Sequence, residues 1–308
     1  MIEITKLTKR FGNLTAVDKL DLHIGAGDIF GFIGPNGAGK TTTMRILVTL
    51  MEPTSGGATI DGLDVRKKGK EVRRRVGYMP DFMGVYDDLK VFEYLEFFAA
   101  AFGIEYRKRK AIVEGVLELT DLTSKQAAAV DSLSRGMQQR LGLARVLIHD
   151  PKVLILDEPA SGLDPRARIE IRELLRELKR MGKTIMISSH ILSELEEICD
   201  RIGIIEHGQL VFGGTMDEIR PRLGIQRKVR VKVLGDDGRA TELLTALPQI
   251  QQVEKVGDYL SVTFREGEPT DGVIARTLVT GGVDLVYLQP EQLKLDDAFL
   301  KLTKGIVH

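Results

Sequence analysis

Hydrophobic and polar residues follow a strand pattern in the first part of the chain. They alternate over residues 2–7 and again over residues 14–24, which is the period of a strand with one buried face. Residues 28–33 are mostly apolar and precede a glycine-rich turn, and residues 42–47 then begin a helix. The pattern predicts a buried strand that is joined to a helix through this turn.

A helical stretch then interrupts the strand pattern between about residues 82 and 135. Val91, Tyr94, Leu95, Phe98 and Ala99 recur there at helical spacing. Strands and helices alternate again after it, at residues 153–156, 166–181, 184–188 and 191–199. Such alternation predicts a mostly parallel sheet with helices on both faces.

The pattern restarts after Pro221 and predicts a second domain. Residues 229–288 follow the order strand, helix, strand, strand, helix, strand, which is that of a small ferredoxin-like α+β domain. A final helix carrying Phe299, Leu300 and Leu302 follows. We therefore predict one domain over residues 1–222 and another over residues 227–308.

Charge and cysteine content narrow the possible partners. The chain has 44 Lys and Arg against 44 Asp and Glu, whereas a dedicated nucleic-acid binder carries a basic excess, so we expect no nucleic-acid partner. The only cysteine, Cys199, cannot form an internal disulfide, which favours a reducing compartment such as the cytoplasm.

No apolar run in the sequence approaches the ~18 residues that span a bilayer. Work at a membrane would therefore need a separate membrane protein.

The glycine-rich turn carries the most specific chemistry. It fits the phosphate-binding pattern G-x-x-x-x-G-K-[ST] through Gly34, Pro35, Asn36, Gly37, Ala38, Gly39, Lys40 and Thr41. The glycines let backbone N–H groups surround a polyphosphate, and the helix that follows adds its positive dipole end. Lys40 should reach the β- and γ-phosphates, the Thr41 hydroxyl should hold Mg²⁺, and Thr42 should border the same site. The turn therefore predicts an ATP site.

Polar side chains also follow two of the later strands. Asp157 and Glu158 end the apolar strand at residues 153–156, and His190 follows the strand at 184–188. Asp157 is placed to hold Mg²⁺, and Glu158 to polarise the water that attacks the γ-phosphate. A neutral His190 could orient that water. Taken alone, the two carboxylates fit a salt-bridged strand end equally well, and the phosphate-binding turn upstream favours the catalytic role.

A second helix start offers another anion site. Ser134 and Gly136 open a helix, where a hydroxyl and a backbone amide can bind phosphate. An ordinary serine N-cap explains the same residues.

Together these segments resemble the ATP-binding subunits of ABC transporters, over residues 1 to about 220. Residues 133–140 resemble the family's signature segment, and residues 161–164, ending at Asp164, match its D-loop. His190 matches the switch histidine. Phe11 matches the aromatic residue that stacks on adenine, although a strand-end core residue is the alternative.

The resemblance implies a fold, an activity and partners. The fold is an α/β P-loop NTPase with a helical insertion, followed here by the small α+β domain. The activity is ATP hydrolysis by a head-to-tail homodimer, in which each ATP lies between the P-loop of one copy and the Ser134–Gly136 segment of the other, and Asp164 also contributes to nucleotide binding. The helical insertion would transmit the motion to a separate integral-membrane permease. The chain would then be cytoplasmic and peripheral on the inner face of the membrane.

The chain departs from the family pattern at two places, and the first of them marks a subtype. Arg135 and Met137 stand where the usual signature has a glycine and a glutamine, a form found in two-component exporters. Residues 296–303 resemble the end of an accessory domain of ABC-2-type exporter ATPases. Asp81 stands where the family usually has a glutamine that contacts Mg²⁺; it could still ligate Mg²⁺, but it adds a negative charge.

These features favour an ABC-2-type export ATPase over two alternatives. A soluble ABC ATPase of translation or DNA repair would call for two ATPase units in one chain, long coiled coils or zinc cysteines. A regulatory module that hydrolyses ATP slowly is the other alternative, and the presence of Asp81 in place of the usual glutamine supports it.

Overall fold

The computed structural model describes the chain apart from residues 83, 85–87, 223–227, 266–271 and 291–308. The described residues form two compact units, Met1–Met216 and a second that begins at Asp217 and whose described residues end at Pro290. In the described residues, no helix combines the length and apolar character that a membrane span requires. The predicted final helix, with Phe299, Leu300 and Leu302, lies outside the described residues.

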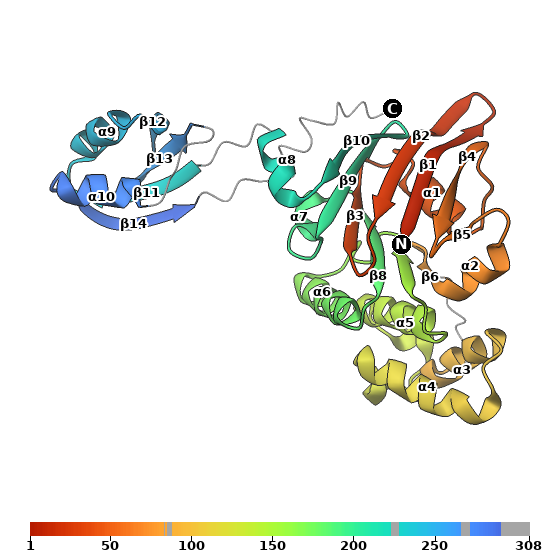
Figure 1. Cartoon of the computed structure of the whole chain (residues 1–308). Coiled ribbons are helices and arrows are strands. Elements are labelled where there is room, and N and C mark those ends of the chain that lie inside the picture. Colours follow the sequence, from red (N-terminus) through yellow and green to blue (C-terminus); the bar gives the residue numbers. More distant parts are fainter. Residues whose placement is uncertain (83, 85–87, 223–227, 266–271, 291–308) are drawn as a thin grey trace. The chain divides into compact units, whose positions relative to one another are not determined.

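A six-stranded sheet forms the centre of the first unit (Figure 1). Its order is β10 (Gln209–Gly214), β9 (Arg201–Glu206), β3 (Ile29–Ile33), β8 (Thr184–Ser189), β7 (Val153–Leu156) and β6 (Val76–Met79). Five of these strands pair in parallel and β10 pairs antiparallel with β9. The mostly parallel sheet that the sequence predicts is confirmed. Because the strands are parallel, the carboxyl ends of β3, β7 and β8 meet at one edge.

Three helices of this unit begin at or directly after predicted site residues: α1 (Lys40–Leu47), α5 (Arg135–Leu147) and α6 (Pro165–Arg180). The unit also contains α7 (Leu192–Leu195), whereas α8 (Met216–Arg222) begins where the two units divide. On α6 the residues Ala167, Ile171, Leu174, Leu175 and Leu178 are buried. This spacing of three and four residues gives the helix one apolar face against the core.

A second, antiparallel sheet belongs to the same unit. Its order is β2 (Leu14–Ile24), β1 (Ile2–Phe11), β4 (Ser55–Ile60) and β5 (Leu63–Asp64), and α2 (Gly69–Arg75) follows. Ile2 and Leu7 of β1 pack in one hydrophobic cluster with Phe30 and Ile155 of the parallel sheet. The two sheets therefore share a core, and β4 and β5 are additions to the predicted strands.

The helical insertion is built from α3 (Val91–Ala101) and α4 (Tyr106–Leu119), which lie side by side (Figure 1). Tyr94, Leu95 and Ala99 are buried, as their spacing predicts, whereas Phe97 is 51% exposed. The short helical turns Thr123–Lys125 and Val130–Ser132 lead back to α5.

The second unit has the predicted order of elements. They are β11 (Lys228–Leu234), α9 (Asp237–Thr245), β12 (Ile250–Val256), β13 (Tyr259–Phe264), α10 (Val273–Thr280) and β14 (Asp284–Pro290). The sheet order β12-β13-β11-β14 is fully antiparallel. Val231, Val262, Leu244 and Leu278 pack in one cluster, which places both helices on the same face of the sheet. This is the ferredoxin-like arrangement.

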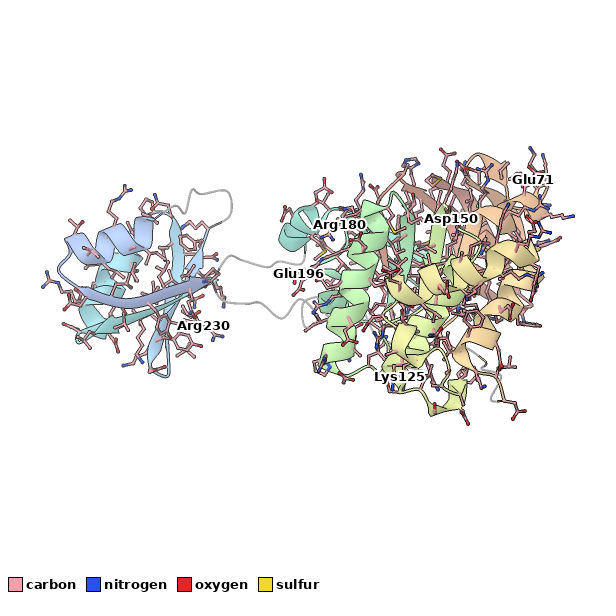
Figure 2. All side chains as sticks on the ribbon, turned by 90° about the horizontal axis from the view of Figure 1, so that it is seen from below. Glu71, Lys125, Asp150, Arg180, Glu196 and Arg230 are labelled. Carbon is pink, nitrogen blue, oxygen red and sulfur yellow. The ribbon has the colours of Figure 1, made fainter. Side chains whose placement is uncertain are left out.

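Charged side chains cover the outside of both units (Figure 2). Glu71, Lys125 and Asp150 are exposed in the first unit, and Arg230 belongs to the second.

Candidate functional site

The turn after β3 has the backbone that a phosphate-binding loop needs. Gly37 and Gly39 have φ angles of 81° and 107°, a region that favours glycine. A Cβ atom on Gly39 would lie 2.4 Å from the carbonyl oxygen of Ala16. Only glycine therefore fits at position 39, directly before α1 begins at Lys40.

Lys40 is buried beneath this loop. Its side chain is 6% exposed, and Nζ donates to the carbonyl oxygens of Gly34 at 2.6 Å and Pro35 at 3.3 Å. Nζ also lies 3.5 Å from Oε1 of Glu158. Burial lowers the pKa of Lys40, and the nearby Glu158 carboxylate acts in the opposite direction.

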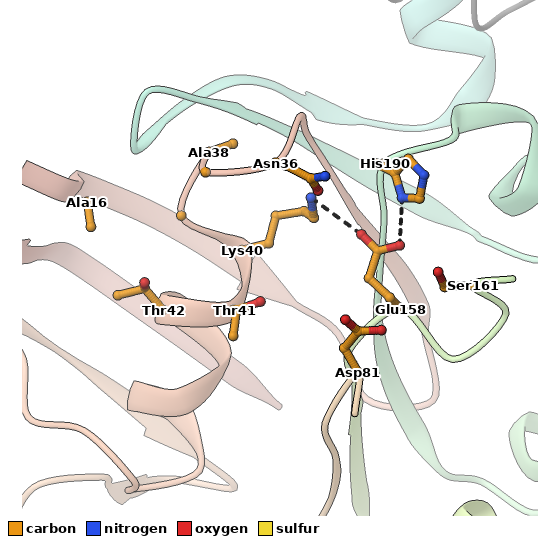
Figure 3. Close-up of a pocket in the computed structure, with 12 residues that line it drawn as sticks. Ala16, Asn36, Ala38, Lys40, Thr41, Thr42, Asp81, Glu158, Ser161 and His190 are labelled. Atoms are coloured by element: carbon orange, nitrogen blue, oxygen red, sulfur yellow. Dashed lines mark hydrogen bonds and ion pairs between the residues drawn. The ribbon is translucent and has the colours of Figure 1, made fainter. Parts of the chain in front are cut away.

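Glu158 is held between Lys40 and His190. The His190 Nδ1 atom lies 2.7 Å from Glu158 Oε2, while Lys40 approaches Oε1 (Figure 3). Glu158 has a φ angle of 51°, a left-handed conformation that costs energy in a residue other than glycine. Its N–H donates to Ser188 Oγ at 2.9 Å, a contact that helps to fix this backbone. The surrounding contacts thus determine where the carboxylate points.

Asp157 lies next to Glu158 and is almost fully buried. Its side chain is 1% exposed and accepts a hydrogen bond of 2.7 Å from Ser188 Oγ. Its N–H donates to the carbonyl of Met79 on β6. A buried carboxylate with so few partners has room for a further cationic partner.

Lys40, Glu158 and His190 line one pocket with a volume of about 260 Å³, whereas Asp157 is not among its lining residues. Its lining residues are Ala16, Asn36, Gly37, Ala38, Gly39, Lys40, Thr41, Thr42, Asp81, Glu158, Ser161 and His190. The predicted phosphate-binding loop, base, histidine and Asp81 therefore come together (Figure 3).

Asp81 brings a further carboxylate into this pocket. Its pKa is raised by partial desolvation first, and then by the negative charges of Asp157 and Glu158; Arg135 and His190 act in the opposite direction. In the part of the chain that the structure describes, no three His, Cys, Asp or Glu side chains converge as a metal cage. A cation here would thus rely on hydroxyl and phosphate oxygens as well as carboxylates.

Ser134, Gly136, Asp164 and Phe11 also lie outside the lining of this pocket, as do Gly34 and Pro35 of the loop. Ser134 caps α5, and its Oγ accepts from the Met137 N–H at 3.4 Å. Asp164 caps α6. Gly136 packs so closely that a Cβ atom there would lie 2.9 Å from Ala167 Cβ. Phe11 ends β1, is 45% exposed and has Lys9 Nζ 5.0 Å from its ring centroid.

Ser188 and Ala16 are site residues that sequence reasoning missed. Ser188 supports both acidic residues from the end of β8, and Ala16 lines the pocket from β2. A hydroxyl residue at the carboxyl end of a strand that precedes a candidate histidine was the available signal for Ser188. No local signal marks Ala16, because its place depends on the pairing of distant strands.

Comparisons with known proteins agree with this geometry. The family model described as "ABC transporter" matches residues 17–161. The bacitracin transport ATP-binding protein BcrA of Bacillus licheniformis is 39% identical over 307 residues, which cover 99% of this chain and 98% of that protein. A Nod factor export ATP-binding protein I of Paraburkholderia xenovorans is 37% identical over 303 residues, which cover 98% of this chain and 96% of that protein. A solved ATP-binding subunit of an ABC transporter superposes with a TM-score of 0.66 at 29% identity, covering 73% of this chain and 94% of that one.

Proposed function

The chain belongs to the family of ABC transporter ATP-binding proteins, and on this premise we propose that it is the ATP-hydrolysing subunit of an ABC-2-type exporter. It would act on the cytoplasmic face of the membrane and drive a separate integral-membrane permease. The two relatives described above carry out bacitracin transport and Nod factor export according to their names, which supports export as the direction.

One observation carries the hydrolytic part of the proposal. One carboxylate, Glu158, lies 3.5 Å from the ammonium of Lys40 and 2.7 Å from His190, in a pocket that the glycine loop also lines. The candidate base thus contacts both a phosphate-binding cation and a histidine. This arrangement suits the attack of water on a terminal phosphate.

The roles of the side chains follow from these contacts. Lys40 would leave the carbonyls of Gly34 and Pro35 and bind the β- and γ-phosphates, while the amides of the loop bind the same oxygens. Glu158, released from Lys40, would accept a proton from the water that attacks the γ-phosphorus. The new P–O bond forms as the bond to the β–γ bridging oxygen breaks, giving ADP and phosphate. His190 would hold the Glu158 carboxylate in place through Nδ1.

The residues present also fit Mg²⁺. Thr41 and Asp81 line the pocket, and Asp157 is a buried carboxylate next to Glu158. Mg²⁺ usually takes only one or two protein carboxylates together with substrate phosphates and water, which agrees with this sparse set. Bound there, the ion would neutralise the charge that develops on the phosphates.

A second copy of the chain would complete the site. Ser134, Gly136 and Asp164 lie outside the pocket of their own copy, and in a head-to-tail homodimer they would face the ATP of the partner. Phe11 would border the adenine, since its ring is 45% exposed.

The test is an ATPase assay with and without a candidate permease that co-purifies with this chain from membranes. We expect the chain to hydrolyse ATP and the rate to change when both proteins are reconstituted in vesicles. Lys40→Ala is the control, because it removes the charge set against the phosphates and should abolish nucleotide binding in a calorimetric titration. Hydrolysis that no permease alters would overturn the exporter role and favour a soluble or regulatory ATPase. Unchanged nucleotide affinity in Lys40→Ala would contradict the proposal that ATP binds in this pocket.

A further inference from the structure

A line of polar contacts runs behind the pocket, from the loop after Glu158 to the segment that carries His190. The loop at residues 161–163 contributes Ser161 to the pocket. The carbonyl oxygen of Leu163 in this loop accepts a hydrogen bond of 3.0 Å from Nε of Arg168 on α6. A shift of that loop would therefore move the guanidinium of Arg168.

The same guanidinium reaches across to α7. Arg168 Nη1 lies 3.1 Å from Oε1 of Glu194, whose side chain is only 11% exposed. A carboxylate so largely withdrawn from water depends on its cation, because removing one partner leaves an uncompensated buried charge.

Glu194 in turn holds the residues on both sides of His190. Ser189 Oγ donates to Glu194 Oε2 at 3.0 Å, and the N–H of Ile191 donates to the same hydroxyl at 3.0 Å. Ser189 is 3% exposed, and its carbonyl accepts from the N–H of Gly34 in the phosphate-binding loop. The backbone on either side of His190 is thus fixed through one serine and one glutamate.

We propose that Arg168 and Glu194 are positioning residues that set His190 against Glu158 according to the position of the loop at 161–163. The inference rests on the proposed ATPase function. The His190 side chain is 42% exposed, so the backbone around it must supply much of its placement. When a nucleotide or a second copy of the chain shifts the loop, Arg168 and Glu194 pass the shift to His190.

Arg168→Ala tests this proposal against a closely matched control. Arg172 lies one turn further along α6 and pairs with Glu197, so Arg172→Ala removes the same kind of ion pair at the same helix. We expect Arg168→Ala to lower kcat about 3- to 30-fold while the KM for ATP changes less than about twofold. We expect Arg172→Ala to leave both constants near those of the wild type. An equal loss of kcat in both variants, or no loss in Arg168→Ala, would overturn the proposal.

A double-mutant cycle and a spectroscopic readout separate positioning from general stability. Glu194→Gln should lower kcat to a similar extent, and the double variant should be little worse than either single one, because both residues act through one connection. Additive losses would contradict that connection. Arg168→Lys should recover part of kcat, since a lysine restores a charge beside Glu194.

The imidazole signals of His190 can be followed by NMR in the nucleotide-free chain. Arg168→Ala should shift them and Arg172→Ala should not, and unshifted signals in Arg168→Ala would count against the inference. Because this readout needs no turnover, an inactive wild-type chain would refute the proposed function and leave the positioning inference separately testable.

Discussion

The two halves of the predicted nucleotide site differ in how their polar groups are occupied. In the half built on the P-loop, Lys40, Glu158 and His190 point at one another in one pocket. In the other half, Ser134 and Asp164 accept hydrogen bonds from amides of their own helices. One copy thus brings together the groups that we propose for catalysis, whereas the residues of α5 and α6 that we propose for phosphate binding serve as helix caps. We therefore expect phosphate binding and closure of the site to be separable.

The sharpest test of the first half is Glu158→Gln. The amide is nearly isosteric and can keep the left-handed backbone, but it cannot accept a proton. We expect kcat to fall by about 10²–10⁴-fold with ATP still bound, and an ATP-bound dimer should accumulate. Steady-state turnover and size-exclusion chromatography with ATP measure the two effects, and turnover near that of the wild type would remove Glu158 from the role of base.

Ser134→Asn tests the second half. Asparagine is as good an N-cap as serine, so the stability of α5 should be unchanged, but the hydroxyl offered to a partner's phosphate is lost. We expect turnover to fall by about 10²-fold, with the affinity of one copy for ATP unaltered. Thermal melting checks the cap, and full activity in a correctly folded variant would confine Ser134 to capping.

A smaller effect is expected from Asp81→Gln, and it should depend on pH. Burial and the neighbouring carboxylates raise the pKa of Asp81 above its ordinary value of 3.8 in the folded state. The folded protein therefore binds this proton more tightly than the unfolded chain, and the associated stability is lost as the pH rises through the folded pKa. The variant should match the wild type at low pH and gain under about 1 kcal/mol at neutral pH, because solvent screens this exposed group. Urea unfolding from pH 3 to pH 7 measures the difference in the free energy of unfolding between the variant and the wild type. A gain in stability that is largest at low pH would contradict a raised pKa of Asp81.

The least effect on nucleotide binding is expected from truncation. A chain that ends at residue 222 keeps every residue of the pocket, so its affinity for ATP should equal that of the full chain. We expect association with a second copy or with the permease to weaken. A truncated chain that fails to fold or to bind ATP would show that residues 227–308 do not form an independent domain.

The sequence predicts what depends on local pattern. The P-loop, the strands that carry Asp157 and His190, and the order of elements in the second unit all follow from periodicity and turn residues, and the structure contains them. The strand β4 was missed because its Ser55, Gly56 and Gly57 interrupt any alternation, and its pairing with β1 joins segments far apart in the chain.

The site residues that the sequence does not predict depend on contacts between segments that are distant in the chain. The hydrogen bond from Ser188 to Asp157 spans 31 positions, and it forms because β7 and β8 lie side by side. The ion pair between Arg168 and Glu194 likewise joins two separate helices, α6 and α7. A single sequence contains the residues but not their adjacency.

The contacts of Lys40 have a consequence for how ionic strength affects nucleotide binding. In the nucleotide-free chain, the buried ammonium already has an anionic partner in Glu158 and two carbonyl acceptors. An incoming triphosphate exchanges one internal counter-charge for another, so few bulk ions are released from this lysine. Its contribution to affinity should therefore change little between dilute and concentrated salt, unlike that of an exposed lysine, whose attraction is screened over about 10 Å at 0.1 M.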